Sequence, residues 1–278
     1  MQTTVEYPHI TDEEMPRWES WIENTTGIVL RGRKRVLEQG IYPRLLACGI
    51  SSLDEYQGLV GKGLQGGAEK AALIDQLTVK DSSFFRNAVA LGAVGDYLLR
   101  RSREVDVDDH QFKIWSVGCA RGQETWSLAM IATELFAFTD VNWSVLGTDI
   151  SPSAVMQASR ASYSEQQIAS VSAHRRARFF TQQDQHWQVN EQLRSRVRFG
   201  ASNLKDIESC PYRDQDVIFC QNVLIYFRAE LVNRIVDQMI QRLRPGGLLV
   251  LGAGEAPDWR STAATRWRPE TLNAYRVT

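Results

Sequence analysis

The sequence contains few residues that commonly bind metals or form disulfides. Its 278 residues include four cysteines and four histidines. The histidines are dispersed and the cysteines form no CxxC pair, so the sequence presents no grouped ligand set for a metal ion. Scattered cysteines in a chain of this length favour free thiols in a reducing compartment. The cysteines are Cys48, Cys119, Cys210 and Cys220.

Long apolar segments are also missing. No apolar run approaches the ~20 residues that a membrane-spanning helix requires. The start of the chain carries the acids Asp12, Glu13, Glu14 and Glu19, which is unlike the basic and apolar pattern of a signal peptide. We therefore expect a cytoplasmic protein without direct membrane insertion.

Neither sign of charge is in excess. Lys and Arg number 32 against 33 acids, for a net charge of -1, so the global electrostatic footprint of a nucleic-acid-binding protein is missing. Hydrophobic residues make up 43% of the chain, which is enough for a packed core and excludes a disordered chain. The length allows one large domain or two unequal ones.

The N-terminal region has helical periodicity. Residues 11–57 carry apolar side chains at helical spacing, and Gly27 and Gly49 are expected to end helices. A stretch with five glycines, Gly58–Gly67, lacks a preceding strand and a Gly-Lys-Ser/Thr ending, so it is interpreted as a linker and not as a phosphate-binding loop. A further helix is expected over Glu69–Leu77. These features predict an N-terminal helical domain over 1–78 with a glycine-containing linker.

From about residue 111 short buried strands alternate with helices, which predicts an α/β, mostly parallel, doubly wound sheet over 79–278. Ser151 and Pro152 are expected to cap and begin one helix. Other helices are expected to end near Phe138 and at Pro245. The expected strands are Phe112–Val117, Trp143–Gly147, Val197–Phe199, Asp216–Cys220 and Leu248–Leu251.

An insertion interrupts this alternation at about residues 175–200. It contains an arginine-rich helix with Arg175, Arg176 and Arg178, and a predicted small antiparallel hairpin around Phe179–Val189.

Chemically useful residues follow successive strands. In such a sheet, ligands bind at the carboxyl ends of the strands, near the point where the strand order reverses. The first expected loop there, Val117–Gly122, has G-x-x-x-G spacing and not the G-x-G-x-x-G of dinucleotide sites. Asp149 follows the next strand and is either a ribose ligand or a helix cap, and Asn203 is either an adenine reader or a turn residue. With the loop after Cys220, this order is typical of a class I methyltransferase.

Several segments carry a family resemblance. They read V-K-D-S-S-F-F-R from Val79, I-W-S-V-G-C-A-R-G-Q-E-T-W-S from Ile114, C-Q-N-V-L-I-Y-F from Cys220 and L-R-P-G-G from Leu243. Together with G-I-V-L from Gly27, followed by Lys34 and Arg35, they resemble motifs of the CheR-type methyltransferases across nearly the whole chain. The resemblance implies a Rossmann-like domain that transfers a methyl group from S-adenosylmethionine to glutamate side chains of chemotaxis receptors, leaving S-adenosylhomocysteine.

The resemblance also implies roles for particular residues. Arg86 and Tyr226 would be catalytic, facing the reacting methyl and the incoming glutamate. Lys80 stands where the family usually has Asn, and Gln221 where it usually has Arg. These departures leave open a non-catalytic module that binds cofactor or receptor without turnover. The implied cofactor-binding residues are Lys80, Ser82, Arg86, Gly118, Glu124, Asp149, Asn203, Leu204, Gln221 and Asn222.

The chemistry of such a reaction constrains these roles. A glutamate is ionised at pH 7, so an in-line methyl transfer to it needs no general base. Positioning and desolvation must then provide the catalysis. Arg86 can orient the acceptor carboxylate by a bidentate contact, and Tyr226 can donate a hydrogen bond. The alternative for Arg86 is a surface ion pair, and for at least one of Phe84 and Phe85 it is core packing.

The expected partner is the cytoplasmic domain of a methyl-accepting chemoreceptor. A basic cluster of Arg31, Arg33, Lys34 and Arg35 could steer the chain to acidic receptor helices, or could be a solvated helix terminus. The segment Ile41–Ala47 is less basic than the second helix of the family. This suggests a divergent receptor, for which a pilus-linked chemosensory system is one hypothesis.

Two further features bear on partners. The expected hairpin lacks glycine and turns tightly near Asp184, which argues against dependence on a receptor tether peptide added to its edge. The loop after Cys220 is not the Asn/Asp-Pro-Pro-aromatic type used on exocyclic amines, which argues against nucleic acid as the substrate. A methyltransferase acting on another substrate remains the alternative.

Overall fold

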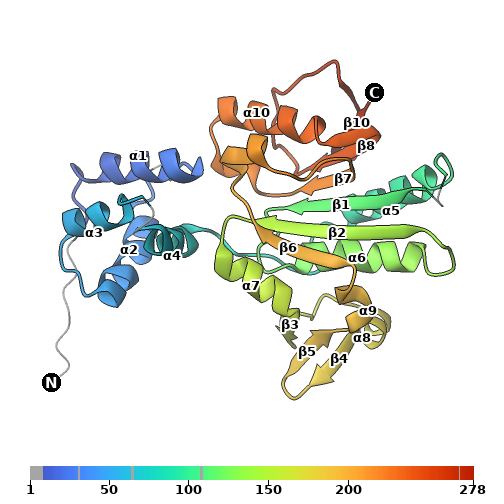
Figure 1. The fold of residues 1–278 in the computed structure, drawn as a ribbon, viewed down its shortest axis with the longest axis horizontal. Coiled ribbons are helices and arrows are strands. Elements are labelled where there is room, and N and C mark those ends of the chain that lie inside the picture. Colours follow the sequence, from blue (N-terminus) through green and yellow to red (C-terminus); the bar gives the residue numbers. More distant parts are fainter. Residues whose placement is uncertain (1–8, 31, 64–65, 107–108, 269) are drawn as a thin grey trace.

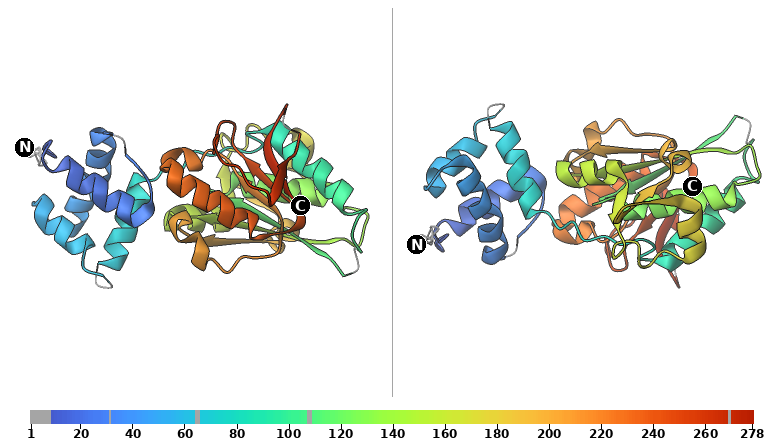
Figure 2. Two further views of the ribbon diagram at one scale, coloured as in Figure 1. Left: turned by 90° about the horizontal axis from the view of Figure 1, so that it is seen from above. Right: turned by 90° about the horizontal axis from the view of Figure 1, so that it is seen from below.

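The computed structural model describes residues 9–30, 32–63, 66–106, 109–268 and 270–278. The chain forms a bundle of helices at one end and a larger body around a central sheet at the other (Figure 1). Both perpendicular views show the bundle beside the sheet-containing body, at the edge where the carboxyl ends of the parallel strands lie (Figure 2).

The bundle consists of α1 (Met15–Thr26), α2 (Lys34–Cys48), α3 (Leu53–Val60) and α4 (Gly67–Leu77). Gly27 and Gly49 follow α1 and α2 with φ of 81° and 66°, which confirms their predicted role as helix stops. The bundle has its own apolar core, formed by residues such as Trp18, Leu37, Ile41, Tyr56 and Leu73.

The glycine-rich stretch is placed differently from the sequence interpretation. Gly58 lies inside α3, and the following turn joins α3 to α4 within the bundle. Residues 64–65 of this stretch lie outside the described residues. The passage from the bundle to the sheet is instead residues 78–87, which lead into α5 (Ala88–Arg101). Helix α5 was not predicted from the sequence, although Asn87 caps it and Ala90, Leu91, Val94 and Leu98 form a buried stripe.

The central sheet has the strand order β6-β2-β1-β7-β8-β10-β9. The first five strands of this order, from the edge strand β6 to β8, pair in parallel, and β10 is antiparallel to both of its neighbours. This confirms the predicted doubly wound sheet of a class I methyltransferase and adds an antiparallel edge that was not predicted. The strands are β1 (Gln111–Val117), β2 (Asn142–Asp149), β6 (Val197–Ala201), β7 (Gln215–Cys220), β8 (Leu243–Leu251), β9 (Ala264–Arg266) and β10 (Asn273–Val277).

Alternating strand residues supply two cores. Val217 and Phe219 pack with α5 and α6 (Gln123–Leu135) on one face, while Ile218 and Cys220 pack with α10 (Ala229–Ile240) on the other. A sheet buried on both faces explains the near-continuous apolar strands of the sequence. The remaining helix of the alternation, α7 (Pro152–Arg160), begins as predicted, with the Ser151 hydroxyl accepting from the amide of Ala154.

Two predicted helix ends were too late. The helix expected to reach Phe138 ends at Leu135, and the helix expected to stop at Pro245 ends at Ile240. The Pro-Gly-Gly segment belongs instead to β8, where Gly246 has a φ of 78°.

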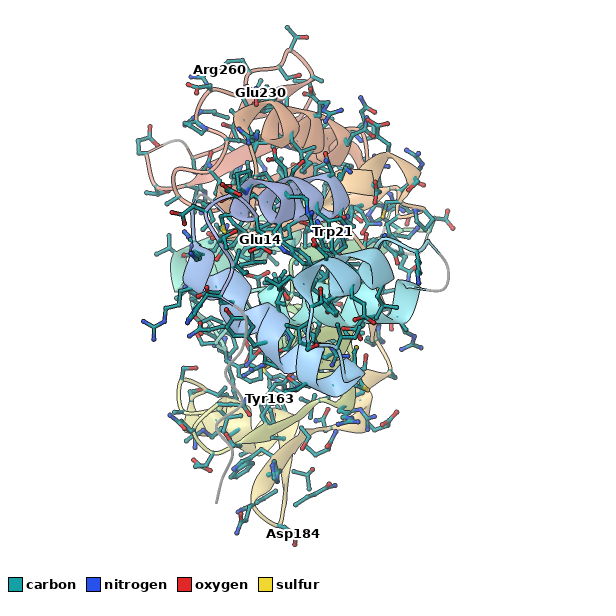
Figure 3. All side chains as sticks on the ribbon, turned by 90° about the vertical axis from the view of Figure 1, so that its left-hand side faces the viewer. Glu14, Trp21, Tyr163, Asp184, Glu230 and Arg260 are labelled. Carbon is teal, nitrogen blue, oxygen red and sulfur yellow. The ribbon has the colours of Figure 1, made fainter. Side chains whose placement is uncertain are left out.

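The insertion forms a small second sheet in the order β3-β5-β4. The predicted hairpin is confirmed as β4 (Phe180–Gln183) and β5 (His186–Val189), with Asp184 at a φ of 52° in its tight turn. Strand β3 (Ser162–Ser164) was not predicted. The arginine-rich helix is α8 (Ala173–Phe179), and the short α9 (Glu191–Arg194) leads back to β6. Asp184 marks the outer tip of this sheet (Figure 3).

Candidate functional site

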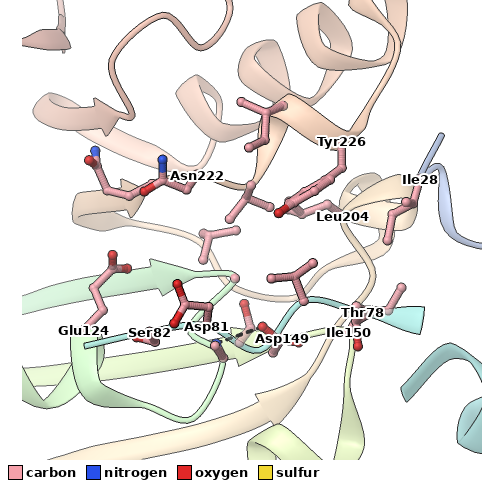
Figure 4. Close-up of a pocket in the computed structure, with 18 of the residues that line it drawn as sticks. Ile28, Thr78, Asp81, Ser82, Glu124, Asp149, Ile150, Leu204, Asn222 and Tyr226 are labelled. Carbon is pink, nitrogen blue, oxygen red and sulfur yellow. Dashed lines mark hydrogen bonds between the residues drawn. The ribbon is translucent and has the colours of Figure 1, made fainter. Parts of the chain in front are cut away.

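A cavity of about 290 Å³ lies at the carboxyl ends of β1, β2 and β7, where the strand order reverses. Ser82, Glu124 and Asp149 lie along one wall, and Asn222 and Tyr226 lie along the wall opposite (Figure 4). Ile28 of the bundle closes one end. The pocket is therefore built by both parts of the chain.

The loop after β1 approaches the loop after β7 very closely. Gly118 has a φ of 69°, and a Cβ added to it would lie 2.3 Å from Cγ2 of Val223. Gly122, with a φ of 87°, would bring a Cβ within 2.7 Å of Ala158. Only glycine satisfies both the backbone conformation and the contact at these positions. The G-x-x-x-G spacing is therefore required by packing as well as by room for a ligand.

Asp149 is anchored at the end of β2. Its two carboxylate oxygens accept from the amides of Ala120 and Ser151, each at 2.9 Å. The cap of α7 is the Ser151 side chain, so the helix-cap alternative for Asp149 is wrong. Burial raises the pKa of the Asp149 carboxyl, and the two amide hydrogen bonds oppose this shift. Each oxygen keeps a lone pair for a ligand hydroxyl.

Glu124 lies at the start of α6 and faces the same pocket. The Ser116 hydroxyl donates to Glu124 Oε1 at 2.8 Å. Burial raises the pKa of Glu124 to about 8, the Ser116 hydrogen bond opposes this shift, and the nearby Glu255 carboxylate adds to it. A cationic ligand would favour the ionised form, so the pocket is suited to a positively charged group.

The loop after β7 presents two amide side chains. Asn222 lines the pocket with a φ of 59°. Gln221 also lines it, and its Oε1 accepts from Asn87 Nδ2 at 2.9 Å. Gln221 Nε2 is buried without a hydrogen-bond partner among the described residues, which leaves a donor available to a ligand.

The side chain of Asn203 already forms hydrogen bonds within the protein, which the adenine-reading role does not require. Its Oδ1 accepts from the amide of Lys205, and its Nδ2 donates to the carbonyl of Thr25 at 3.1 Å. The turn-residue alternative therefore describes its contacts, and Asn203 also links the sheet to the end of α1. Both Asn203 and Leu204 line the pocket.

The F-F-R segment supplies one core ring and several pocket residues. Phe84 is buried against Tyr163 and Phe180, which confirms core packing for one of the two rings. Ser82, Phe85 and Arg86 line the pocket. Arg86 lies 3.5 Å from Asp81 in an exposed ion pair, so its guanidinium can exchange that partner at small cost.

Lys80 is not brought to the pocket lining. Its ammonium pairs with Asp75 Oδ2 at 2.9 Å, and Asp75 also accepts from both the amide and the hydroxyl of Ser153 at the start of α7. Burial alone would raise the pKa of Asp75, but hydrogen bonds from Ser151 and Lys80 outweigh it and lower the value. Lys80 therefore contributes to the contact between α4 and α7, which is formed by Asp75 and Ser153.

The bundle contributes residues that the sequence analysis did not assign to the pocket. Ile28, Val29, Arg33 and Val36 line the pocket, and the amide of Val29 donates to the carbonyl of Tyr226 at 2.8 Å. The segment between α1 and α2 is thus fixed beside the predicted catalytic tyrosine. Glu23 reinforces this joint by pairing with Arg228 through both of its carboxylate oxygens.

Comparison with known proteins identifies the family. Residues 13–78 match the model described as CheR methyltransferase, all-alpha domain, and residues 80–268 match CheR methyltransferase, SAM binding domain. The chain belongs to the CheR methyltransferase family. It is an enzyme of the S-adenosylmethionine-dependent class, as the sequence resemblance implied.

Curated relatives cover most of the chain. A chemotaxis protein methyltransferase of Borreliella burgdorferi is 30% identical over 254 residues, covering 89% of each chain. Chemotaxis protein methyltransferase 1 of Pseudomonas aeruginosa is 32% identical over 244 residues, covering 85% of this chain and 87% of the relative. The Escherichia coli K12 relative, also a chemotaxis protein methyltransferase, is 27% identical over 251 residues, covering 88% of this chain and 85% of the relative.

The pocket fits the cofactor of the family. S-adenosylmethionine carries a sulfonium and an ammonium, and the acids Glu124 and Asp149 face the space that it would take. The unpartnered Gln221 Nε2 and the missing Cβ of Gly118 provide a donor and room. Within the described ranges, no group of metal-ligating side chains was found, and no helix combines the length and apolar character needed to cross a bilayer.

We predict that Asp149→Ala weakens the binding of S-adenosylhomocysteine by about ten- to a hundredfold. Losing a charge-assisted hydrogen bond to the ribose corresponds to roughly 1.5–3 kcal/mol. Calorimetry measures the affinity. Ser151→Ala is the matched control, because it removes the neighbouring helix cap without removing a pocket group. Unchanged affinity in folded Asp149→Ala would contradict the ribose role.

We predict that Glu124→Gln stabilises the cofactor-free protein at pH 8.5 and not at pH 5. The pKa of Glu124 is raised from 4.5 to about 8. The folded state therefore binds more protons than the unfolded state between these values. The stabilisation of the folded protein that comes from protonated Glu124 is fully present below pH 4.5 and is lost as the pH rises through 8.

Thermal unfolding of both proteins at the two pH values measures this difference. We expect a gain of roughly 1–3 kcal/mol for the variant at the higher pH, and each kcal/mol raises Tm by roughly 2–4 °C in a chain of this size. A Tm difference that is the same at both pH values would show that the Glu124 carboxyl titrates normally.

Proposed function

We propose that this enzyme transfers the methyl group of S-adenosylmethionine to glutamate side-chain carboxylates in the cytoplasmic domain of a methyl-accepting chemoreceptor. The observation that carries the proposal is the distribution of charge in the pocket. Glu124 and Asp149 are the more buried pocket residues, here called its floor, while Arg33 and Arg86 are exposed residues of the lining, here called its mouth. The floor suits a cationic cofactor, and the mouth suits an anionic acceptor.

Family membership supports this choice of substrate. The relatives described above are named chemotaxis protein methyltransferases, and the match extends through the bundle as well as the cofactor domain. We assign chemistry and cofactor binding to residues 79–278, and recognition of the receptor to residues 1–78.

Residue roles follow from this assignment. Asp149 would bind the ribose, Glu124 would face the cofactor ammonium, and Asn222 and Gln221 would contact the rest of the cofactor. Lys80 would act indirectly, by holding Asp75 and the start of α7. The other cofactor-binding residues would be Ser82, Arg86, Gly118, Asn203 and Leu204.

When bound, S-adenosylmethionine supplies an electrophilic methyl group. The acceptor glutamate is already ionised at neutral pH, so no side chain has to remove a proton. Arg86 leaves its exposed pair with Asp81 and orients the acceptor carboxylate. Tyr226, fixed by the amide of Val29, sets the approach angle through its hydroxyl. The apolar side chains Ile28, Val223 and Ile225 exclude water around the reacting groups.

Transfer of base-labile methyl label to a purified receptor domain tests the function directly. Methyl esters release methanol in base, whereas methylated amines do not. Label that survives base treatment, or transfer only to nucleic acid or small molecules, would favour the alternative methyltransferase. Cofactor binding without transfer to any receptor would favour the non-catalytic module.

We predict that Arg86→Ala and Tyr226→Phe each lower kcat by about ten- to a hundredfold while changing Tm little. Both side chains line the pocket. Arg86 belongs to neither core, and Tyr226→Phe keeps the ring that packs against the core around α10. The exposed Arg178→Ala is the control for loss of an arginine. Activity within twofold of wild type in both variants would show that the active-site assignment is wrong.

Receptor docking is assigned to the start of α2. Arg33, Lys34 and Arg35 stand at its N-terminal end, where the helix dipole disfavours positive charge. Lys34 forms an exposed ion pair with Asp12 at 3.3 Å. Such a pair is weak, so Lys34 can leave Asp12 and pair with an acid of a receptor helix instead. Arg31 lies outside the described residues. Arg44, in contrast, forms two hydrogen bonds to Glu69 inside the bundle and is not assigned to docking.

Dependence on a receptor tether peptide is not expected. The β4–β5 hairpin turns at Asp184 after strands of four residues each, so β4 offers a short edge for a further strand. We therefore assign recognition to the bundle alone, in a cytoplasmic enzyme whose receptor belongs to a divergent system, for which a pilus-linked one is the hypothesis.

We predict that a receptor C-terminal peptide does not bind in a calorimetric titration, and that methylation of the full receptor domain falls as ionic strength rises. Exposed ion pairs are screened by salt, with a Debye length of about 8 Å at 0.15 M. Arg35→Glu should raise KM for the receptor, and the control Arg103→Glu, at the far end of the molecule, should not. Micromolar peptide binding would overturn the prediction.

A further inference from the structure

A buried carboxylate lies directly behind the wall that carries Asn222 and Tyr226. Glu255 follows β8 and is only 2% exposed. It is not part of the pocket lining, and nothing in the motifs described above points to it. Its side chain extends from the turn after β8 to the loop after β7.

The Glu255 carboxylate is surrounded by backbone amides. Its Oε1 accepts from the amides of Val223 at 2.8 Å and Leu224 at 2.7 Å, and its Oε2 accepts from the amide of Gly252 at 2.7 Å. Successive amides that converge on one anion form a concave binding site for it. Here the anion is a side chain of the protein, so the loop after β7 wraps around an internal carboxylate.

This anchoring sits next to a residue in an uncommon conformation. Asn222 has a φ of 59°, in the left-handed region that Gly, Asn and Asp adopt more readily than other residues. The two amides bound by Glu255 belong to the residues immediately after Asn222. The hydrogen bonds therefore hold the chain in the conformation that turns the Asn222 side chain into the pocket, and Tyr226 follows within the same loop.

The surroundings of Glu255 are themselves fixed. Asn273 Nδ2 on β10 donates to the carbonyls of Gly252 at 2.9 Å and Glu255 at 2.7 Å. A Cβ at Gly252 would lie 2.5 Å from Glu255 Oε2, so only glycine leaves room for the carboxylate. Residues at the ends of β7, β8 and β10 thus contact Glu255, through its carboxylate or through its backbone carbonyl.

We propose that Glu255 is a positioning residue, whose carboxylate holds the 222–226 loop so that Asn222 meets the cofactor and Tyr226 meets the acceptor. It acts through these two residues and does not touch the reacting atoms. The inference deepens the proposed function, on which its turnover measurement rests.

Glu255→Gln tests the proposal, because it keeps the size of the side chain and replaces one acceptor oxygen by a donor that faces backbone donors. We expect kcat to fall by about tenfold or more, since a displacement near 1 Å can cost ~100-fold. Affinity for S-adenosylhomocysteine, measured by calorimetry, should fall as well through Asn222. Glu255→Asp, which keeps the charge, should retain more activity than Glu255→Gln.

Asp216→Asn is the matched control. Asp216 is also a buried carboxylate of this sheet and accepts from the amide of Lys113, but it lies at the opposite end of β7. It should lower Tm and leave kcat unchanged. If Glu255→Gln lowers Tm as Asp216→Asn does and keeps kcat within twofold of wild type, Glu255 is merely structural and the proposal is overturned.

A double-mutant cycle separates positioning from general damage. If Glu255 acts through Tyr226, Tyr226→Phe should lower kcat less in the Glu255→Gln background than in wild type. Simple multiplication of the two effects would contradict the proposal. If Glu255→Gln does not fold, Gly252→Ala serves as a second test, because the added methyl group displaces the carboxylate without removing it. Gly252→Ala should lower both kcat and the affinity for S-adenosylhomocysteine. Unchanged values would contradict the proposal.

Failure of the two proposals can be told apart. Absence of receptor methylation by the wild-type enzyme contradicts the proposed function. The effect of Glu255→Gln on S-adenosylhomocysteine affinity needs no acceptor, so it still tests the link to Asn222. If the wild-type enzyme methylates the receptor and Glu255→Gln does so at the same rate, only the role of Glu255 is contradicted.

Discussion

The contact between Gly118 and Val223 is the constraint on which the site depends. It brings the loop after β1 against the loop after β7 at the point where the strand order reverses, with no space for even one methyl group between them. Val223 is held from the other side by the Glu255 carboxylate. The two loops therefore form a single wall, and the pocket takes its shape from the ends of the strands rather than from flexible side chains.

Charge is the second organising feature. Glu124, Asp149 and Glu255 are drawn into one region with raised pKa values, because burial disfavours their ionised forms. Without cofactor, the ionised forms of these three carboxyls are therefore unfavourable. The positive charge of a sulfonium cofactor would stabilise them. At the mouth the balance reverses, because Arg33 and Arg86 are exposed residues of the pocket lining. The bundle also lines the pocket, so on the proposed function the part of the chain that selects the receptor also completes the site.

Features encoded by local pattern could be predicted from the sequence. Strand ends, the glycine loop, Asp149 and the Ser151 cap follow from periodicity and from what each residue type does beside a turn. Contacts between distant segments could not be predicted in this way. Asn203 binds the carbonyl of Thr25, 178 residues away, and Gln221 binds Asn87, 134 residues away. The helix α5 was missed although its cap and apolar stripe are present in the sequence, whereas Glu255 and Arg33 acquire their places only through the tertiary fold.

On the proposed function, the enzyme methylates glutamate side chains of a receptor. The most direct test is to incubate the wild-type enzyme with S-adenosylmethionine and a purified receptor cytoplasmic domain, and to locate each added methyl group by tandem mass spectrometry of receptor peptides. The structure predicts methyl groups on glutamate residues of the receptor helices, as esters that disappear after mild base. Methyl groups confined to lysine, arginine or peptide termini, or none at all from an enzyme that binds the cofactor, would contradict it.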